Sequence, residues 1–142
     1  MDSGSQRVIP KYEAKLRLDD LIEAKLSEYH SLQALAEAND EHFPSSHGVS
    51  VELKQRRHEL ALAYNERGHI HYRLIEFDEA VEDYTEALNY DNCLAAAYYN
   101  RGTVHYRMGY FSIALEDMKK AVSLDPNNKE FFKGLEETKR QL

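Results

Sequence analysis

The most constraining feature of this sequence of 142 residues is a segment that occurs twice. "AYNERGHIHYRLIEFDEAVEDYTEAL", which begins at Ala63, returns as "AYYNRGTVHYRMGYFSIALEDMKKAV", which begins at Ala97. When residues 61–94 are laid over residues 95–128, fourteen positions are identical. A fixed period of this length is typical of stacked supersecondary units, none of which can bury its apolar face alone. The sequence therefore predicts two like units packed side by side.

Each copy has the pattern of two antiparallel helices. Apolar residues recur every three or four positions, which is the helical period, and the pattern is interrupted between Leu74 and Asp78. In the second copy the interruption is "MGYF", where Gly109 can end a helix. Gly68 and Gly102 lie inside the first helix of each copy, where glycine costs about 1 kcal/mol relative to alanine. We expect the missing side chain to let the second helix approach closely.

Residues 1–60 do not show the repeat. An apolar stripe with steps of three or four positions predicts one long amphipathic helix that begins near Pro10. The stripe consists of Leu18, Ile22, Leu26, Tyr29, Leu32 and Ala36. Residues 38–50 contain Pro44 and Gly48 and are expected to form a loop, with helix resuming near Val51 and running into the first copy. Residues 1–60 are thus interpreted as a helix plus a loop: a degenerate repeat or cap, or alternatively a groove-filling or dimerising segment.

The C-terminal residues 129–142, "KEFFKGLEETKRQL", predict a final amphipathic helix that caps the stack. We expect Phe131, Phe132 and Leu135 to face inward and the charged residues to face outward. Pro126, in the preceding "DPNN", stops the helix before it, because proline cannot continue the hydrogen-bond ladder.

The residues kept in both copies resemble the tetratricopeptide repeat, a helix-turn-helix module whose period is the one seen here. The positions that carry the resemblance are Tyr64, Gly68, Tyr72, Phe77, Ala80, Tyr84 and Ala87, and then Tyr98, Gly102, Tyr106, Phe111, Ala114, Ala121 and Pro126. The resemblance implies an all-α fold, a right-handed α-α superhelix of stacked helix-turn-helix repeats. Its units would be repeats at 61–94 and 95–128, with an N-terminal helix before them and the capping helix at 129–142 after them.

The resemblance also implies a function, that of a non-catalytic adaptor or scaffold which binds a peptide or protein segment in a concave groove. The first helix of each repeat would line this groove. The implied groove residues are Asn65, Glu66, His69, Tyr72, Arg73, Tyr99, Asn100, Thr103, Tyr106 and Arg107. Repeated Tyr and Arg on one helical face is a composition typical of protein-binding surfaces.

Two alternatives stay open for these residues. Tyr72 and Tyr106 could instead be packing residues at the repeat interface. If Arg73 and Arg107 project into the groove, they would favour an acidic peptide or a C-terminal carboxylate as the ligand. Alternatively, Arg73 forms an ion pair with Glu66 or Glu76.

The carboxylate clamp that some family members use for chaperone C-termini is matched poorly. The clamp requires Lys and Asn at the positions where this chain has Asn65 and His69, and Asn at the position of Asn100, which is the one match. It requires Lys and Arg at the positions where this chain has Glu130 and Gly134. A co-chaperone is therefore an alternative function, and a structural module that self-associates is another, although we expect a monomer rather than a homo-oligomer.

Composition excludes several other classes of protein. A formal net charge of −7 argues against binding to nucleic acid or to an anionic membrane surface, and no stretch reaches the length of an apolar membrane span. The single cysteine, Cys93, and the lack of a signal-like N-terminus favour the cytosol, or the nucleus.

We expect no cofactor, no metal and no catalytic residue. His71 and His105 occupy equivalent positions and are expected to be packed, hydrogen-bonded imidazoles. An acidic run on the second helix of the first copy is expected to be a solvated face. This run consists of Glu76, Asp78, Glu79, Glu82, Asp83 and Glu86.

Overall fold

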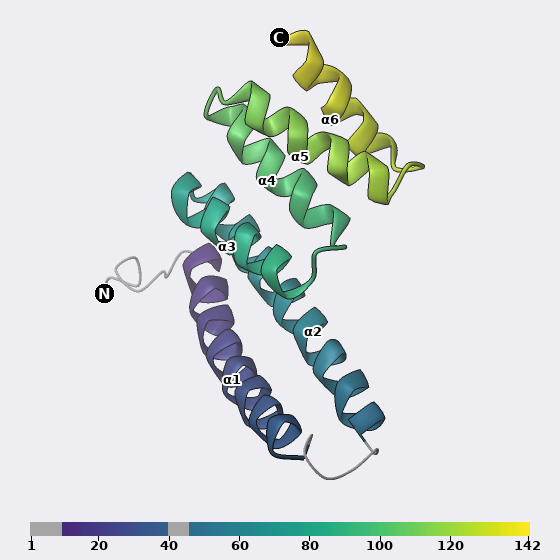
Figure 1. Ribbon diagram of the computed structural model, residues 1–142. Helices are drawn as coiled ribbons and strands as arrows, with labels where there is room; N and C mark the ends of the chain where they lie inside the picture. Colours follow the sequence, from purple (N-terminus) through teal and green to yellow (C-terminus); the bar gives the residue numbers. More distant parts are fainter. Residues whose placement is uncertain (1–9, 40–45) are drawn as a thin grey trace, which may run out of the picture.

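The protein is all-helical, as predicted. The computed structural model describes residues 10–39 and 46–142, and these residues form six helices without a strand. The helices are α1 (Pro10–Asn39), α2 (Ser46–Arg73), α3 (Phe77–Tyr90), α4 (Ala95–Arg107), α5 (Phe111–Leu124) and α6 (Lys129–Arg140). In Figure 1, α1 and α2 form a long hairpin, and the shorter helices α3 to α6 continue the stack from one end of α2.

The helices form two layers. Each helix packs against the next one along the chain, and α4 also contacts both α2 and α6. The first helices of the two repeats therefore lie in one layer with the capping helix, while α3 and α5 lie in the other. This alternation is the stacking of helix-turn-helix units that the repeated sequence predicts.

The two helices of each repeat approach closely at a glycine, which confirms the expected role of Gly68 and Gly102. A Cβ atom on Gly68 would lie 2.8 Å from Cε1 of Tyr84, in α3. A Cβ atom on Gly102 would lie 3.2 Å from the backbone oxygen of Ala114, in α5. Ala80 and Ala114 are themselves fully buried, and at Gly102 a small residue, Ala114, lies on the opposite side of the contact.

Helix α1 supplies an apolar layer beneath the first repeat. Leu18, Ile22 and Tyr29 of the predicted stripe are buried, and α1 packs along α2. Ile22 and Tyr29 belong to one cluster with Leu60 and Tyr64 of α2 and with alanines of α3 and α4. The short repeat array thus gains buried apolar contacts from a helix outside the repeats, which is what a stack of few repeats needs.

Two predictions about helix ends and faces were wrong. Residues 38–39 and 46–50 of the expected loop are helical, because α1 continues to Asn39 and α2 already begins at Ser46; the predicted loop residues 40–45 lie outside the described residues. First-turn residues need no strong helix propensity, so Gly48 did not prevent an early start. On α6, Phe131 and Leu135 are buried, whereas Phe132 is 55% exposed because its position is rotated by about 100° from that of Phe131.

Candidate functional site

The ten predicted groove residues lie on the layer formed by the first helices. Asn65, Glu66, His69, Tyr72 and Arg73 belong to α2, and Tyr99, Asn100, Thr103, Tyr106 and Arg107 belong to α4. Glu66, His69, Arg73 and Arg107 are exposed, and the other six are half-buried. All ten side chains are therefore at least partly accessible on this layer.

A cavity of about 190 Å³ brings five of these residues together. Tyr72, Tyr99, Thr103, Tyr106 and Arg107 line it with Gly134, which the sequence indicated only as a clamp position, and with three residues that the sequence did not indicate, namely Met118, Glu137 and Thr138. Met118 belongs to α5, whereas Gly134, Glu137 and Thr138 belong to α6. The cavity is thus closed on one side by the capping helix.

The remaining five predicted residues do not line this cavity. The amide of Asn100 donates to the side-chain oxygen of Asn65 at 3.1 Å and so joins α4 to α2. His69 lies beside Tyr72, with 6.3 Å between the ring centroids. Glu66 and Arg73 are exposed on α2.

The tyrosines both line the cavity and pack against the following helices. Tyr72 stacks on Phe77 at 5.8 Å, and Tyr106 meets Phe111 edge-on at 5.3 Å. Tyr99 stacks on Phe131 of α6 at 4.8 Å. The two alternatives that the sequence left open for Tyr72 and Tyr106 are therefore compatible: one ring face can pack while another part of the side chain remains accessible.

Two hydrogen bonds connect these tyrosines to α6 and to the residue after it. The hydroxyl of Tyr99 donates to Glu130 at 3.4 Å, and Gln141 donates to the hydroxyl of Tyr106 at 3.3 Å. Burial, followed by the nearby Glu130 carboxylate, raises the pKa of Tyr99. Tyr99 is therefore a neutral hydrogen-bonding group at physiological pH.

Arg73 and Arg107 are the cations of this surface. Neither takes part in an ion pair with any residue in the described parts of the chain, and Glu76 instead contacts His71. The proposed ion pair of Arg73 with Glu66 or Glu76 is thus not formed. Acidic groups lie toward α6, where Glu137 lines the cavity and Glu130 contacts Tyr99.

The clamp positions on α6 are unsuited to a carboxylate. Glu130 carries the wrong charge, and Gly134 has no side chain. A Cβ atom on Gly134 would lie 2.9 Å from the ring of Tyr99, so this glycine allows α6 to approach α4. The α6 side of the surface is shaped by packing rather than by cationic side chains.

Asp83 corrects the expectation that the acidic run on α3 is entirely solvated. Asp78, Glu79, Glu82 and Glu86 are exposed, but Asp83 is 4% exposed. Its two carboxylate oxygens accept from Nε and Nη2 of Arg67 at 2.8 and 2.7 Å. Helix α3 therefore turns Asp83 inward, toward α2.

The two equivalent histidines differ in their partners. His71 is buried and its Nδ1 lies 3.2 Å from Glu76, as expected for a hydrogen-bonded imidazole. His105 is half-buried, and its Nδ1 has no hydrogen-bond partner among residues 10–39 and 46–142, since Tyr110 occupies the place of Glu76 in the second copy; the Asp117 carboxylate lies 3.8 Å from it. Across residues 10–39 and 46–142, no three His, Cys, Asp or Glu side chains are grouped as they would be around a metal ion.

The arrangement defines a class of protein, a helical-repeat domain with two helix-turn-helix units and a capping helix. None of the helices in the described residues combines the length and apolarity needed to cross a lipid bilayer.

Two family models match the chain: "TPR repeat" over residues 76–109, which spans α3 and α4, and "Tetratricopeptide repeat" over residues 95–128, which spans α4 and α5. Residues 76–128 of this chain are therefore similar to tetratricopeptide repeats.

Solved structures of tetratricopeptide repeat domains share this fold. The TPR2B domain of yeast Sti1, in a complex with pHsp70, is 19% identical, with 82% of this chain and 99% of that chain covered and a TM-score of 0.56. The Arabidopsis OM64 TPR domain is 20% identical, with 83% and 99% covered and a TM-score of 0.57. The second TPR domain of human RPAP3, in complex with the HSP70 peptide SGPTIEEVD, is 20% identical, with 81% and 98% covered and a TM-score of 0.55. A search of curated proteins found no match.

Proposed function

We propose that this chain is a non-catalytic adaptor that holds a peptide or protein segment on the surface formed by α2, α4 and α6. The observation that carries the proposal is the cavity of about 190 Å³ in which three tyrosines, from two repeats, meet Arg107. Tyr and Arg are enriched where proteins bind other proteins, because they combine large contact area with directed hydrogen bonds. Similar domains of Sti1 and RPAP3 are found in complex with pHsp70 and an HSP70 peptide.

The charges of this surface favour a bound segment that carries an acidic group on its α2–α4 side rather than on its α6 side. Arg73 and Arg107 occupy equivalent places at the C-terminal ends of α2 and α4, and since neither forms an ion pair within the described residues, both can pair with acidic groups of a bound segment. Glu130 and Glu137, on the α6 side, would repel such groups. The segment would thus place an acidic group near the two arginines and a neutral side chain in the cavity between the tyrosines.

The test is capture of partners from a cell lysate by the wild type and by the double variant Arg73→Glu with Arg107→Glu. Both arginines are exposed, so we expect unchanged helicity and melting, together with loss of the captured proteins. The matched control is Lys119→Glu with Lys120→Glu, which makes the same charge change on the exposed face of α5. Capture that survives in the arginine variant would discard this site.

A co-chaperone is the second candidate function, and the structural neighbours with chaperone peptides favour it. Glu130 and Gly134 argue against the clamp form of such binding. Titration with an acidic chaperone-tail peptide separates the two candidates. Tight binding that is lost in the variants Asn65→Ala and Asn100→Ala would favour a clamp, whereas weak binding would favour a different peptide class.

A structural role through self-association is the third candidate. Leu16, Leu35 and Val51 are each at least 60% exposed along the α1–α2 hairpin, and a second chain could cover them. We propose instead that the chain acts as a monomer. Sizing over a range of micromolar concentrations decides, because a mass that rises with concentration would favour the structural role.

We also propose that the protein works in the cytosol or the nucleus, in line with its single cysteine. We further propose, from the segments "AYNERG", "DEAVEDYTEAL" and "YYNRGTVHYRMGYF", that the chain is related to the small animal tetratricopeptide repeat protein thirty-two. Imaging of a tagged full chain tests the first of these proposals, and exclusion from both compartments would overturn it.

A further inference from the structure

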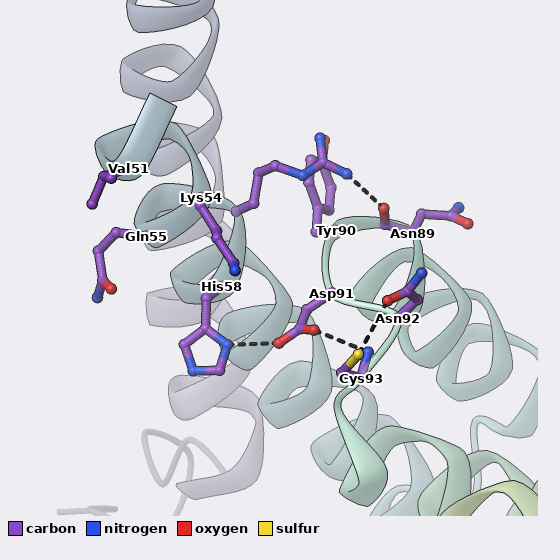
Figure 2. Close-up of a pocket in the computed structure, with 10 residues that line it drawn as sticks. Val51, Lys54, Gln55, His58, Asn89, Tyr90, Asp91, Asn92 and Cys93 are labelled. Carbon is purple, nitrogen blue, oxygen red and sulfur yellow. Dashed lines mark hydrogen bonds and ion pairs between the residues drawn. The ribbon is translucent and has the colours of Figure 1, made fainter. Parts of the chain in front are cut away.

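A second and larger cavity lies away from the proposed peptide surface. It has a volume of about 660 Å³ and lies between the N-terminal half of α2 and the turn that joins α3 to α4. Its lining consists of Val51, Lys54, Gln55, Arg57 and His58 on one side and Asn89, Tyr90, Asp91, Asn92 and Cys93 on the other. In Figure 2, Lys54 and His58 extend from α2 toward the turn.

The cavity exists because α2 is longer than a repeat helix. Its first wall is formed by residues 51–58, all of which precede the predicted repeat boundary at 61. The first helix of the second repeat, α4, begins at Ala95 and has no such extension. The site is therefore a feature of this chain's own N-terminal region rather than of the repeats.

Arg57 brings a positive charge to this cavity and forms no ion pair with a carboxylate within residues 10–39 and 46–142. Its Nη1 donates to the hydroxyl of Tyr29 at 2.7 Å, and its Nη2 donates to the backbone oxygen of Asn89 at 2.8 Å. Both partners are neutral. The guanidinium also lies 5.8 and 5.3 Å from the ring centroids of Tyr29 and Tyr90, contacts that fix its position.

Lys54 adds a second positive charge. Its ammonium takes part in no ion pair within residues 10–39 and 46–142, and the same holds for Arg57. The neighbouring Arg56 differs, because it pairs with Glu28 at 2.9 Å on another face of α2. Two cations that form no ion pair within the described residues thus border one cavity, in a chain whose formal net charge is −7.

Asp91 is the carboxylate of the cavity, and it is already engaged. One of its oxygens lies 2.7 Å from Nδ1 of His58, and the other accepts from the backbone N–H of Cys93 at 3.0 Å (Figure 2). These contacts hold Asp91 against the turn. Asp91 keeps its negative charge there, and the two cations Lys54 and Arg57 against this one carboxylate leave the lining with a positive formal charge.

We propose that this cavity binds a phosphomonoester group. Such a group carries about −1.5 to −2 charges at neutral pH and matches two cations, whereas a carboxylate carries only one charge. Cavities of roughly 300–1,000 Å³ are of the size that holds small ligands or a side chain with its neighbours. Tyr90 and Val51 supply apolar surface for the group that bears the phosphate. The phosphomonoester could belong to a phosphorylated protein side chain or to a free small molecule.

The test is a titration of the full chain, followed by the amide signals of Asn89, Asp91, Asn92 and Cys93 in nuclear magnetic resonance spectra. The probes are phenyl phosphate, a short alanine-glycine peptide with one phosphoserine, the same peptide without phosphate, and benzoate as a monoanion. We expect saturable shifts of these amides with both phosphate probes and weaker binding, by roughly tenfold, with benzoate. Tighter binding of the phosphopeptide than of phenyl phosphate would indicate a protein side chain as the source, and the reverse a free small molecule.

The variant Lys54→Glu should weaken binding of both phosphate probes by roughly tenfold, since it replaces an attractive charge with a repulsive one. Lys54 is exposed, so this variant is expected to fold. The control Lys120→Glu makes the same charge change on α5 and should alter the affinity by less than about twofold. Absence of saturable shifts at the turn, or equal losses in the two variants, would overturn the proposal.

Discussion

Arg67 and Asp83 join the two helices of the first repeat through a two-point ion pair, with N–O distances of 2.8 and 2.7 Å. Arg101 and Asp117 form the same pair in the second repeat, at 2.9 and 2.8 Å. Both carboxylates are buried, so each depends on its arginine for neutralisation. The repeated pair is a structural link between first and second helices, formed by residues that are identical in the two copies.

Replacing Asp117 with Asn should lower the free energy of unfolding by about 2–3 kcal/mol. The change leaves the partly buried guanidinium of Arg101 with Thr85 as its remaining side-chain hydrogen-bond partner, at 3.2 Å. The arginine side chain is 22% exposed, so water offsets part of the loss. Urea unfolding followed by circular dichroism measures the difference.

The equivalent change in the first repeat should cost less. Arg67 also pairs with Asp19 of α1, at 2.9 Å, and it keeps this carboxylate when Asp83 is replaced by Asn. We expect the loss for Asp83→Asn to be smaller than that for Asp117→Asn by roughly 1 kcal/mol. Equal losses would show that Asp19 contributes nothing to the neutralisation of Arg67.

The stability of the protein should fall in acid partly through Asp117. Burial acts to raise the pKa of Asp117, but the hydrogen bonds and charge of Arg101, with His105 nearby, outweigh it, so the pKa is lowered from its ordinary value of 3.8. A lowered pKa means that the unfolded chain binds the proton more readily than the folded chain. The contribution of Asp117 is therefore complete above about pH 4 and is lost as the pH falls through the lowered pKa.

We expect the unfolding free energy of the wild type to decline more steeply below about pH 4 than that of Asp117→Asn. Urea unfolding at a series of pH values measures both slopes. Asp125→Asn, a change at an exposed carboxylate, is the control and should retain the wild-type slope. A variant Asp117→Asn with the wild-type slope would contradict the assignment.

The repeat period was sufficient to predict the fold of residues 61–128, because it locates the same glycine and the same turn twice. It was not sufficient to predict the role of Asp83. The local charge pattern places Asp83 with its acidic neighbours, although the spacing from Arg67 to Asp83 recurs from Arg101 to Asp117. A residue pair kept in both copies is therefore a better guide to which charged side chains are buried than the local charge pattern.

The two cavities could be predicted only in part. The residues of α2 and α4 follow from the repeat, but Gly134, Glu137 and Thr138 belong to a helix whose sequence has diverged. These three positions lie one full repeat period after Asn100, Thr103 and Val104, and that offset could have found them. The larger cavity depends on where the extension of α2 lies relative to the α3–α4 turn, a tertiary relationship that no local pattern encodes.

Gly68→Ala should destabilise the protein by about 1–2 kcal/mol. The new methyl group would lie 2.8 and 2.9 Å from two ring carbons of Tyr84, a side chain that is 1% exposed and has little room to move. Overpacking of this kind costs roughly 1–3 kcal/mol, and the gain in helix propensity of about 1 kcal/mol offsets part of it. Thermal unfolding measures the shift.

The second repeat provides the comparison for this variant. In Gly102→Ala the nearest atoms would lie at 3.2 to 3.3 Å, which requires smaller adjustments. We expect a loss of less than about 1 kcal/mol, because the gain in propensity nearly balances the tighter contact. If Gly102→Ala were as damaging as Gly68→Ala, the close contact with the ring of Tyr84 would not be the cause of the loss in Gly68→Ala.

Ile75→Gly should stabilise the protein by about 1 kcal/mol. Ile75 has φ 62° in the turn between α2 and α3, a left-handed conformation that is costly for a β-branched residue, and its side chain is 75% exposed. Gly109 occupies the equivalent place in the second repeat with φ 85°, and both turns close with equivalent backbone hydrogen bonds. Glycine thus relieves strain at position 75 while exposing no buried apolar surface, although its greater freedom in the unfolded chain reduces the gain.

The reciprocal change Gly109→Ile should cost about 1–2 kcal/mol, and differential scanning calorimetry of both variants checks the pair. A lower melting temperature for Ile75→Gly would indicate that the isoleucine side chain makes a stabilising contact that outweighs its backbone strain.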